Sequence, residues 1–453
     1  MAKAAKLREA RAEGLLAADA ATLRERLASG ALDAVELAEA CLARIEARES
    51  EVQAWAFLDP EHVRAQARQL DQHRKAGRPL GPLHGLPVGL KDVIDTAKIP
   101  TENGCALDAG RRPLFDAFVV ERLKQAGAII MGKTVTTELA FLHPGKTRNP
   151  HNLAHTPGGS SSGSAAAVAD GHVPLAIGTQ TGGSVIRPAS FCGITGYKPT
   201  FGAIPRRGVL QQSPTLDTIG TFGRTPACAA LLAEAIWGFD PADRATSPEP
   251  APRLFDAARS APPVRPVFAL VHPPGWEEAD PQLHAAFDEL EAALGEQVFR
   301  VELPAPFRQA AALRERINLA EMARCYYTYG RDGLDRLGPE TRDALEAGNS
   351  ILARDYLSAL DWREVLNAGL AEIFERADAI LCPAAMGPAP EGLGSTGSSL
   401  FNGLWTFCGT PAVTVPALTS QEGLPMGVQL VTARGDDARL LRNATWLLNW
   451  LDQ

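Results

Sequence analysis

Hydrophobic positions in the first part of the chain recur at helical spacing. Leu37 and Cys41 lie four residues apart on one predicted face, and Asp33 with Glu36 is typical of a capped helix start. This pattern predicts a helical segment over residues 1–80.

Beyond residue 80 the pattern changes to short apolar runs that indicate β-strands. The run at 86–90 predicts a buried strand that ends at Lys91, and a helix at 118–125 and a strand at 128–131 follow it. Strands that alternate with helices in this way predict an α/β fold with mixed or parallel strands. The same patterns predict further strands at 267–274, 297–304, 379–383, 411–418 and 427–433, and helices at 281–294, 306–376 and 436–450.

Strand-like runs toward both ends of the chain indicate one sheet that a long middle segment interrupts. Residues 238–265 are rich in proline and charge, which predicts an exposed connection. We therefore expect a single domain over residues 1–453. Its parts are a helical N-terminal segment (1–80), a core that carries the candidate chemistry (81–235), a variable, mostly helical, substrate-shaping segment (240–376) and a return to the core sheet (377–453).

Composition and charge argue against several classes of partner. The 453 residues are 45% hydrophobic, and 45 Lys and Arg against 53 Asp and Glu give a net charge of −8. A mildly acidic chain without a basic run is a poor binder of nucleic acid or of an anionic membrane. No stretch approaches the roughly 18 apolar residues of a spanning helix, and the charged first 20 residues do not resemble a secretory signal. These features predict a cytoplasmic protein.

Cysteine usage agrees with a reducing compartment. The seven cysteines are odd in number and scattered, and no two of them form a CxxC pair. Such a pattern argues against a disulfide framework and against a zinc ribbon. We therefore expect no metal site and no cofactor.

Two stretches rich in glycine and serine carry the candidate chemistry. Residues 157–164 read PGGSSSGS, and residues 178–184 read GTQTGGS. Small residues let the backbone approach a bound group and turn several N–H groups toward it, as an oxyanion hole requires. The N–H groups predicted to form such a hole belong to Thr181, Gly182, Gly183 and Ser184, and Ser184 is the candidate nucleophile.

A serine nucleophile needs a base, and Lys91 is the candidate. This lysine ends an apolar strand, and burial there disfavours the ammonium form. Lowering its pKa from ~10.4 to ~7–8 requires a bias of roughly 4 kcal/mol from the surroundings. Ser160 lies in the other Gly/Ser loop, and a hydroxyl between Lys91 and Ser184 would relay the proton.

These motifs, in this order, resemble those of the amidase signature family. The resemblance extends over nearly the whole chain, in GLPVGLKDVID (85–95), GGSS (158–161), GTQTGGSVIRPASFCG (178–193), GYKPTFG (196–202), LDTIG (216–220), DAILCP (378–383), GTPAVTVPA (409–417) and GLPMGVQLV (423–431). It implies a large mixed, twisted β-sheet covered by helices on both faces. It also implies Lys91 as the base, Ser160 as a relay serine held by a cis peptide bond, and Ser184 as the acylated nucleophile.

Two positions depart from the commoner family pattern. Many relatives have Asp where this chain has Gln180, so the usual negative charge near Lys91 is missing there. Ser162 adds a third hydroxyl to its loop. These variants look closest to the bacterial malonamidase branch, which acts on small amides.

Other interpretations of the same stretch stay open. Ser161 lies within a GxSxG pattern, the elbow of Ser-His-Asp hydrolases, but a loop-like stretch precedes it where that motif needs a strand. His151 and His155 have the i, i+4 spacing of a metal-binding helix. They lack the glutamate of HExxH, however, and they lie between two prolines.

Four further residues are candidates for substrate contact. Arg187, three residues after the candidate nucleophile, would be able to hold a carboxylate with two hydrogen bonds, and the alternative is a structural role. Tyr326, Tyr327 and Trp405 are candidates for lining the substrate pocket, with core packing as the alternative.

We therefore predict an amidohydrolase that cleaves the C–N bond of a small amide, anilide or carbamate (urethane) through an acyl-enzyme on Ser184. It would act on bonds other than peptide bonds and work as a monomer or homodimer. The alternative is a subunit of the kind found in glutaminyl- or aspartyl-tRNA amidotransferases. The resemblance implies that such subunits share this fold and work with partner chains. The exact substrate is not predicted, because residues 240–376 would shape most of the pocket.

Overall fold

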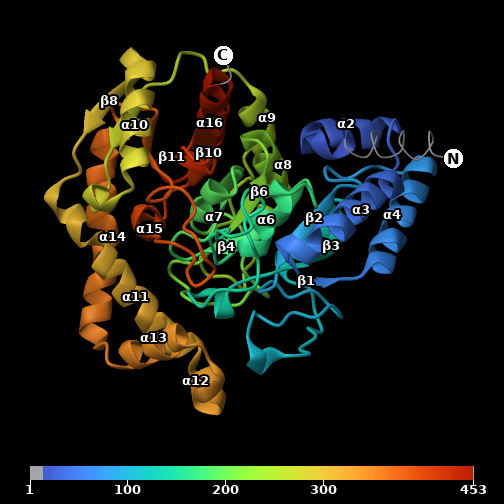
Figure 1. Cartoon of the computed structure of the whole chain (residues 1–453), viewed down its shortest axis with the longest axis horizontal. Coiled ribbons are helices and arrows are strands. Elements are labelled where there is room, and N and C mark those ends of the chain that lie inside the picture. The colour runs from blue at the N-terminus through green and yellow to red at the C-terminus, as the bar shows by residue number, and fades with distance from the viewer. Residues whose placement is uncertain (1–13, 452–453) are drawn as a thin grey trace.

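The computed structural model describes residues 14–451. Eleven strands form one mixed β-sheet among these residues, and helices cover both of its faces (Figure 1). This arrangement confirms the predicted fold class. In sheet order the strands are β1 (Trp55–Leu58), β3 (Ile129–Thr134), β2 (Pro87–Lys91), β4 (Leu175–Gln180), β6 (Thr218–Gly223), β5 (Thr195–Lys198), β10 (Ala412–Thr419), β11 (Pro425–Val431), β9 (Ala379–Pro383), β7 (Phe268–Val271) and β8 (Val298–Val301).

Parallel strands lie in two separate parts of this sheet. Strand β2 runs parallel to β3 and β4, and near the other edge β7 runs parallel to β8 and β9. The strands between these parts pair antiparallel with their neighbours. Every residue of β2 is buried, as expected for a continuous apolar run in a parallel region with covered faces.

Helices form layers on the sheet and a separate block beside it. They are α2 (Ala20–Ser29), α3 (Ala34–Val52), α4 (Pro60–Lys75), α5 (Phe118–Gln125), α6 (Ser162–Ala169), α7 (Ile186–Phe191), α8 (Pro226–Ile236), α9 (Leu254–Arg259), α10 (Pro281–Leu294), α11 (Ala310–Cys325), α12 (Tyr327–Gly333), α13 (Pro339–Asn349), α14 (Ala353–Phe374), α15 (Leu400–Cys408) and α16 (Asp437–Leu451). Helices α8, α9 and α16 pack on one another, and α6 and α7 pack on the central strands. Helix α8 is buried at nearly every position, which agrees with its apolar sequence. Within residues 14–451, no helix combines the length and the apolarity needed to cross a membrane.

The N-terminal segment differs from its prediction in two ways. It is not helical throughout, because β1 interrupts the helices and pairs with β3. Helix α3 begins after Asp33, yet the side chain of Asp33 does not cap it. Instead, the carboxylate of Asp71 in α4 accepts hydrogen bonds from the backbone N–H groups of Ala34 (2.8 Å) and Val35 (3.0 Å). Residues 1–13 of the predicted helical segment lie outside the described residues.

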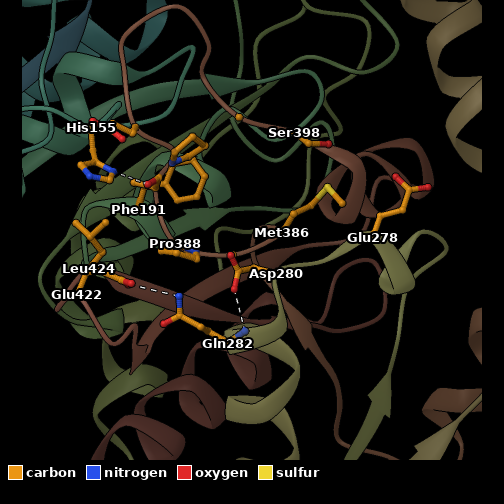
Figure 2. Close-up of a pocket in the computed structure, with 15 residues that line it drawn as sticks. His155, Phe191, Glu278, Asp280, Gln282, Met386, Pro388, Ser398, Glu422 and Leu424 are labelled. Atoms are coloured by element: carbon orange, nitrogen blue, oxygen red, sulfur yellow. Dashed lines mark hydrogen bonds between the residues drawn. The ribbon is translucent and has the colours of Figure 1, made fainter.

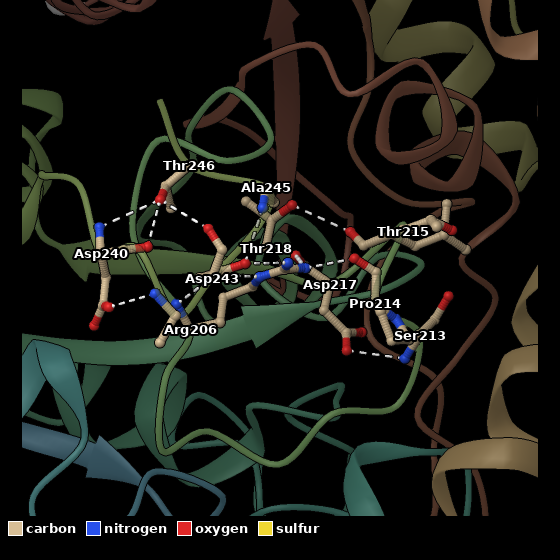
Figure 3. Close-up of polar contacts among 12 residues, drawn as sticks. Arg206, Ser213, Pro214, Thr215, Asp217, Thr218, Asp240, Asp243, Ala245 and Thr246 are labelled. Carbon is tan, nitrogen blue, oxygen red and sulfur yellow. Dashed lines mark hydrogen bonds and ion pairs between the residues drawn. The ribbon is translucent and has the colours of Figure 1, made fainter. Parts of the chain in front are cut away.

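The predicted exposed connection at 238–265 is anchored to the core and contains helix α9. Arg206 donates hydrogen bonds to both carboxylate oxygens of Asp243, at 2.9 Å and 2.8 Å, as Figure 3 shows. The same guanidinium donates to the backbone oxygens of Pro214 (2.7 Å) and Asp217 (3.0 Å). One arginine thereby joins this connection to the loop that carries Asp217.

The middle segment takes part in the sheet and does not merely interrupt it. Strands β7 and β8 extend the sheet beyond β9, so the predicted interruption is wrong for this part. The helices predicted over 306–376 form the block of α11 to α14 (Figure 1). Helix α11 packs on α13, α14 and α15, and this contact with α15 brings the block toward the central strands.

Candidate active site

Lys91 is the last residue of β2, and its side chain is completely buried (0% exposed). Its Nζ lies 2.7 Å from Ser160 Oγ and 2.7 Å from Thr179 Oγ1. Because β2 and β4 are parallel neighbours, their carboxyl ends meet at one edge of the sheet, which brings Lys91 beside Thr179. Ser160 comes from the loop before α6, and its peptide bond with Gly159 is cis.

The surroundings of Lys91 favour its neutral form. Burial lowers the pKa of Lys91 to about 7, and the negative charge of Asp217 opposes this shift. Among the described residues Lys91 makes no ion pair, and its near partners are the hydroxyls of Ser160 and Thr179. A neutral amine has a lone pair that can accept a proton from a hydroxyl. The lowered pKa agrees with the expectation from the sequence.

Asp217 supplies a buried carboxylate near the site, although Gln180 replaces the usual family aspartate. Its Oδ1 accepts a hydrogen bond from Thr181 Oγ1 (2.5 Å), and its Oδ2 accepts bonds from the backbone N–H groups of Gln212 and Ser213 (2.9 Å each). Burial raises the pKa of Asp217 to about 6, although these hydrogen bonds lower it. Asp217 thus combines two effects, because it holds the start of the loop at Thr181 and places negative charge near the amine.

Gln180 anchors the other end of the same loop. Its Oε1 accepts hydrogen bonds from the backbone N–H groups of Val185 (2.8 Å) and Ile186 (3.0 Å), and its Nε2 donates to Thr406 Oγ1 (3.0 Å). The first N–H groups of a helix have no carbonyl partner within that helix. Gln180 therefore supplies the acceptor for two such groups at the start of α7. A neutral amide at this position therefore has a clear structural role.

Residues 181–184 form the loop between these two anchors. Among the described residues, none of the four backbone N–H groups in the loop donates a hydrogen bond. The hydroxyl of Ser184 also makes no hydrogen bond within residues 14–451, and this residue is 9% exposed. Four unpaired donors beside an available hydroxyl are what an oxyanion hole with its nucleophile requires.

Comparison with known proteins assigns the chain to a family. A sequence profile described as Amidase matches residues 36–441. The chain belongs to this family. One relative is a subunit of glutamyl-tRNA(Gln) amidotransferase from Chloroflexus aggregans. It is 35% identical over 455 aligned residues, which cover 92% of this chain and 93% of the relative.

Solved structures of other proteins are similar over almost the entire chain. One comes from work described as "An unexpected vestigial protein complex reveals the evolutionary origins of an s-triazine catabolic enzyme", with a TM-score of 0.89 and 29% identity. The match covers 96% of this chain and 98% of that one. The structure of 6-aminohexanoate cyclic dimer hydrolase matches with a TM-score of 0.86 and 26% identity, over 97% and 98% of the two chains. These similarities agree with the Amidase assignment.

The other two serines of the family's glycine- and serine-rich loop are engaged elsewhere. Ser161 Oγ donates to the backbone oxygen of Thr179 (3.2 Å), and Ser162 Oγ donates to that of Gly158 (2.7 Å). No strand precedes Ser161, so the strand–turn–helix geometry of a GxSxG elbow is not formed. Ser160 is therefore the one serine of the three that contacts Lys91.

The two histidines considered as metal ligands contact backbone oxygens. His151 Nε2 lies 2.9 Å from the oxygen of Cys192, and His155 Nδ1 lies 2.7 Å from that of Ala389. Residues 150–155 form turns rather than a helix, so the i, i+4 spacing does not place the rings on a helical face. In the described part of the chain, no three His, Cys, Asp or Glu side chains are grouped to hold a metal ion.

Of the three aromatic residues predicted to line the pocket, two are buried in the core and one is exposed on the surface. Tyr326 is fully buried and its hydroxyl donates to the backbone oxygen of Leu139 (2.7 Å). Trp405 is fully buried in a hydrophobic cluster, whereas Tyr327 is 61% exposed. The structure shows no hydrogen bond from any of them to the three triad candidates, so a role in substrate binding stays a prediction.

Arg187 is almost completely buried (2% exposed) and lies close to the Ser160 loop. Its Nη2 donates to the backbone oxygen of Gly159 (2.6 Å) and to Thr396 Oγ1 (3.2 Å). Its Nε and Nη1 have no hydrogen-bond partner in the described residues. Arg187 therefore supports the loop and still has donors available.

A pocket of about 620 Å³ is lined in part by His155 and Phe191 (Figure 2). The acidic residues Glu278, Asp280 and Glu422 line it, and Gly397 and Ser398 form part of its wall. It contains none of the three triad candidates. This pocket and the reacting groups are thus separate features.

Sequence reasoning missed two residues of the candidate site. It gave no role to Thr179 or to Asp217, although both belong to motifs that carry the family resemblance. The position of Thr179 in the sequence was the available signal for its role. It immediately precedes Gln180 at the end of a buried strand, next to the candidate oxyanion loop. Their contacts with Lys91 and Thr181 became apparent only in the folded chain.

Proposed function

We propose that this protein is an amidohydrolase that cleaves a C–N bond through an acyl-enzyme on Ser184. The observation that carries the proposal is the 2.7 Å contact between Lys91 Nζ and Ser160 Oγ, buried beside a loop with unpaired N–H groups. A depressed lysine pKa and a relay hydroxyl supply the base that a serine nucleophile lacks by itself.

In the proposed reaction, Ser160 passes its proton to Lys91 Nζ and takes the proton of Ser184. Ser184 Oγ then bonds to the substrate carbonyl carbon, and the loop N–H groups of residues 181–184 stabilise the negative oxygen. The proton on Lys91 returns through Ser160 to the leaving nitrogen, the C–N bond breaks, and ammonia or an amine departs. A water molecule then gives a proton through Ser160 to Lys91, and its oxygen bonds to the acyl carbon. The bond between that carbon and Ser184 Oγ breaks, the acid is released, and the proton returns through Ser160 to Ser184.

The first candidate for the biological setting is the ammonia-supplying subunit of an amidotransferase. The 35% identity to a subunit of glutamyl-tRNA(Gln) amidotransferase, over nearly the full length of both chains, favours this setting. Glutamine would be the amide in that case, and partner chains would receive the ammonia. The second candidate is an independent enzyme for a small amide, anilide or carbamate, which the similarity to 6-aminohexanoate cyclic dimer hydrolase favours.

A substrate panel tests the chemistry and separates the two settings. Purified protein is incubated with L-glutamine, a primary amide, an anilide and a carbamate, and released ammonia or amine is measured. An independent enzyme turns over one of the small substrates without partners. An amidotransferase subunit hydrolyses glutamine weakly alone and faster when amidotransferase partner subunits are added. Failure of every substrate under both conditions would overturn the proposal.

Covalent labelling tests the nucleophile itself. A fluorophosphonate should give one adduct on Ser184, located by mass spectrometry of peptides, and Ser184→Ala should abolish both labelling and turnover. Ser161→Ala is the matched control, because Ser161 contacts a backbone oxygen and should leave the label on Ser184. An adduct on Ser161 would contradict the assignment.

A further inference from the structure

A second arginine approaches the candidate oxyanion loop from the middle segment of the chain. Arg314 lies on α11, and a side chain at Gly182 would place its Cβ 3.4 Å from Arg314 Nη1 and 3.1 Å from Ser399 Oγ. We propose that Arg314 selects amide substrates that carry a carboxylate and binds that group in the cavity that it lines with Ser399, near Gly182. This inference rests on the proposed amidohydrolase function and names its substrate class.

The space beside Gly182 has unpaired donors on two sides. Arg314 and Ser399 make no side-chain hydrogen bond to any residue of the described chain. Arg314 and Ser399 line a cavity of about 50 Å³, and the absence of a side chain at Gly182 lets both polar groups approach the loop closely. Gly182 is two residues before Ser184, so a ligand group placed here is close to the reacting carbonyl. The free donors and the cavity therefore belong to one site.

The charges around this space are unbalanced in favour of an anion. No described ion pair includes the half-buried Arg314 or the buried Arg187. Burial lowers the pKa of Arg187 to about 10, and the positive charge of Arg314 contributes to this shift, so the two guanidinium groups lie within electrostatic range of each other. By contrast, the buried Arg206 has a carboxylate partner in Asp243. Charges removed from water in proteins are generally paired, so the buried, unpaired Arg187 with a second cation near it indicates an anionic ligand.

A carboxylate matches these donors better than other anions that an amide substrate commonly carries. Guanidinium groups bind carboxylates through paired, charge-assisted hydrogen bonds, and Ser399 Oγ can donate a further bond. The carboxylate would lie near Gly182 while the amide carbon lies at Ser184, and these residues are only two positions apart. The substrate carboxylate must therefore be only a few bonds from the amide carbon. Monoamides of short dicarboxylic acids meet this requirement, and so do amino acids with an amide side chain.

The test compares two substrates that differ in charge. Succinamate carries a carboxylate, and its methyl ester is the neutral counterpart; kcat/KM is measured for both from ammonia release. We expect the wild type to prefer succinamate, and Arg314→Gln to lower this preference by about 10²-fold, the scale of two charge-assisted hydrogen bonds. Arg314→Lys should restore part of the preference, because it restores the positive charge without the planar fork.

Arg316→Gln is the matched control, because Arg316 lies on the same helix but faces solvent. It removes the same charge and should leave the preference unchanged. A wild type without preference, or an Arg314→Gln variant that slows both substrates equally, would overturn the inference. An Arg316→Gln variant with the same loss as Arg314→Gln would also overturn it, because the effect would then be one of overall charge.

A binding measurement separates this inference from the proposed reaction. In the Ser184→Ala background, calorimetry should detect succinamate binding, and the added Arg314→Gln change should weaken that binding by about 10²-fold. This result does not depend on turnover. If binding follows Arg314 but no amide is hydrolysed by the protein with Ser184 intact, the proposed reaction fails and the carboxylate site stands. If amides are hydrolysed but binding ignores Arg314, the carboxylate site fails alone.

Discussion

Two completely buried lysines lie on neighbouring parallel strands, and only one of them has a carboxylate partner in the described part of the chain. Lys91 of β2 contacts the hydroxyls of Ser160 and Thr179. Lys133 of β3 lies 3.4 Å from Asp92 Oδ1, and it donates to the backbone oxygen of Ile94 (2.6 Å) and to Thr101 Oγ1 (2.8 Å). Burial lowers the pKa of both lysines, to about 7 for Lys91 and to about 8 for Lys133. Burial alone therefore does not distinguish a candidate base from a structural cation.

The difference lies in the carboxylate of Asp92 beside Lys133. The negative charge of Asp92 and the carbonyl oxygen of Ile94 stabilise an ammonium group on Lys133, whereas Lys91 has no such carboxylate partner among the described residues. A hydroxyl accepts one proton and donates another, so Ser160 can exchange protons with a neutral Lys91. The neighbouring ion pair of Lys133 and Asp92 supplies structure close to the site, whereas Lys91 remains free for chemistry.

Replacement of Lys91 should have the largest effect on activity. Arg at this position stays charged at every accessible pH and cannot accept a proton, so Lys91→Arg should lower kcat/KM by at least about 10³-fold. The measurement is steady-state turnover of whichever amide the substrate panel identifies, with circular dichroism to verify the fold. Near-normal activity of a folded Lys91→Arg enzyme would remove the distinction between the two lysines.

Replacement of Lys133 should lower the stability of the fold and leave the catalytic rate of the folded protein nearly unchanged. Lys133→Met leaves Asp92 buried without its ion-pair partner, which should lower the free energy of unfolding by about 3–5 kcal/mol. Denaturant titration measures this loss, and active-site titration with a fluorophosphonate corrects turnover for the folded fraction. Turnover per labelled site should stay close to that of the wild type. A stable protein with lost turnover per site would show that Lys133, too, serves the reaction.

The second hydroxyl partner of Lys91 should contribute less than Ser160. Thr179→Val removes a 2.7 Å hydrogen bond to Nζ and keeps the shape of the side chain, so kcat/KM should fall about 10-fold. Thr179→Ser retains the hydroxyl and should recover most of this loss. Equal losses in the Val and Ser variants would instead assign the effect to packing of the threonine methyl group.

The charge of Asp217 should shift the pH profile rather than abolish activity. The neutral amine is the working form, so kcat/KM should rise with pH through the lysine pKa of about 7. Asp217 raises that pKa, so Asp217→Asn should lower it and move the rising limb to lower pH. A limb that stays in place or moves to higher pH, in a variant with an unchanged Tm, would show that Asp217 acts only by holding Thr181.

Local patterns in the sequence were sufficient for several elements. The helices at 118–125 and 281–294 have the predicted bounds, because amphipathic spacing and flanking residues act over a few positions. The strand that ends at Lys91 is also confirmed, since a short apolar run before a turn has few other buried arrangements. The strand at 55–58 was missed because its four residues lie between two strong helical patterns.

The sequence by itself determined the family, the fold class and the chain positions at which glycine- and serine-rich loops occur. The tertiary structure decided which groups meet there. Thr179 contacts Lys91 from 88 residues away, and Asp217 contacts Thr181 from 36 residues away. Arg314 reaches Gly182 from a helix in the middle segment. A residue pattern records the spacing of neighbours along the chain, whereas charge and hydrogen-bond partners depend on distances in space, which the packing of strands and helices sets.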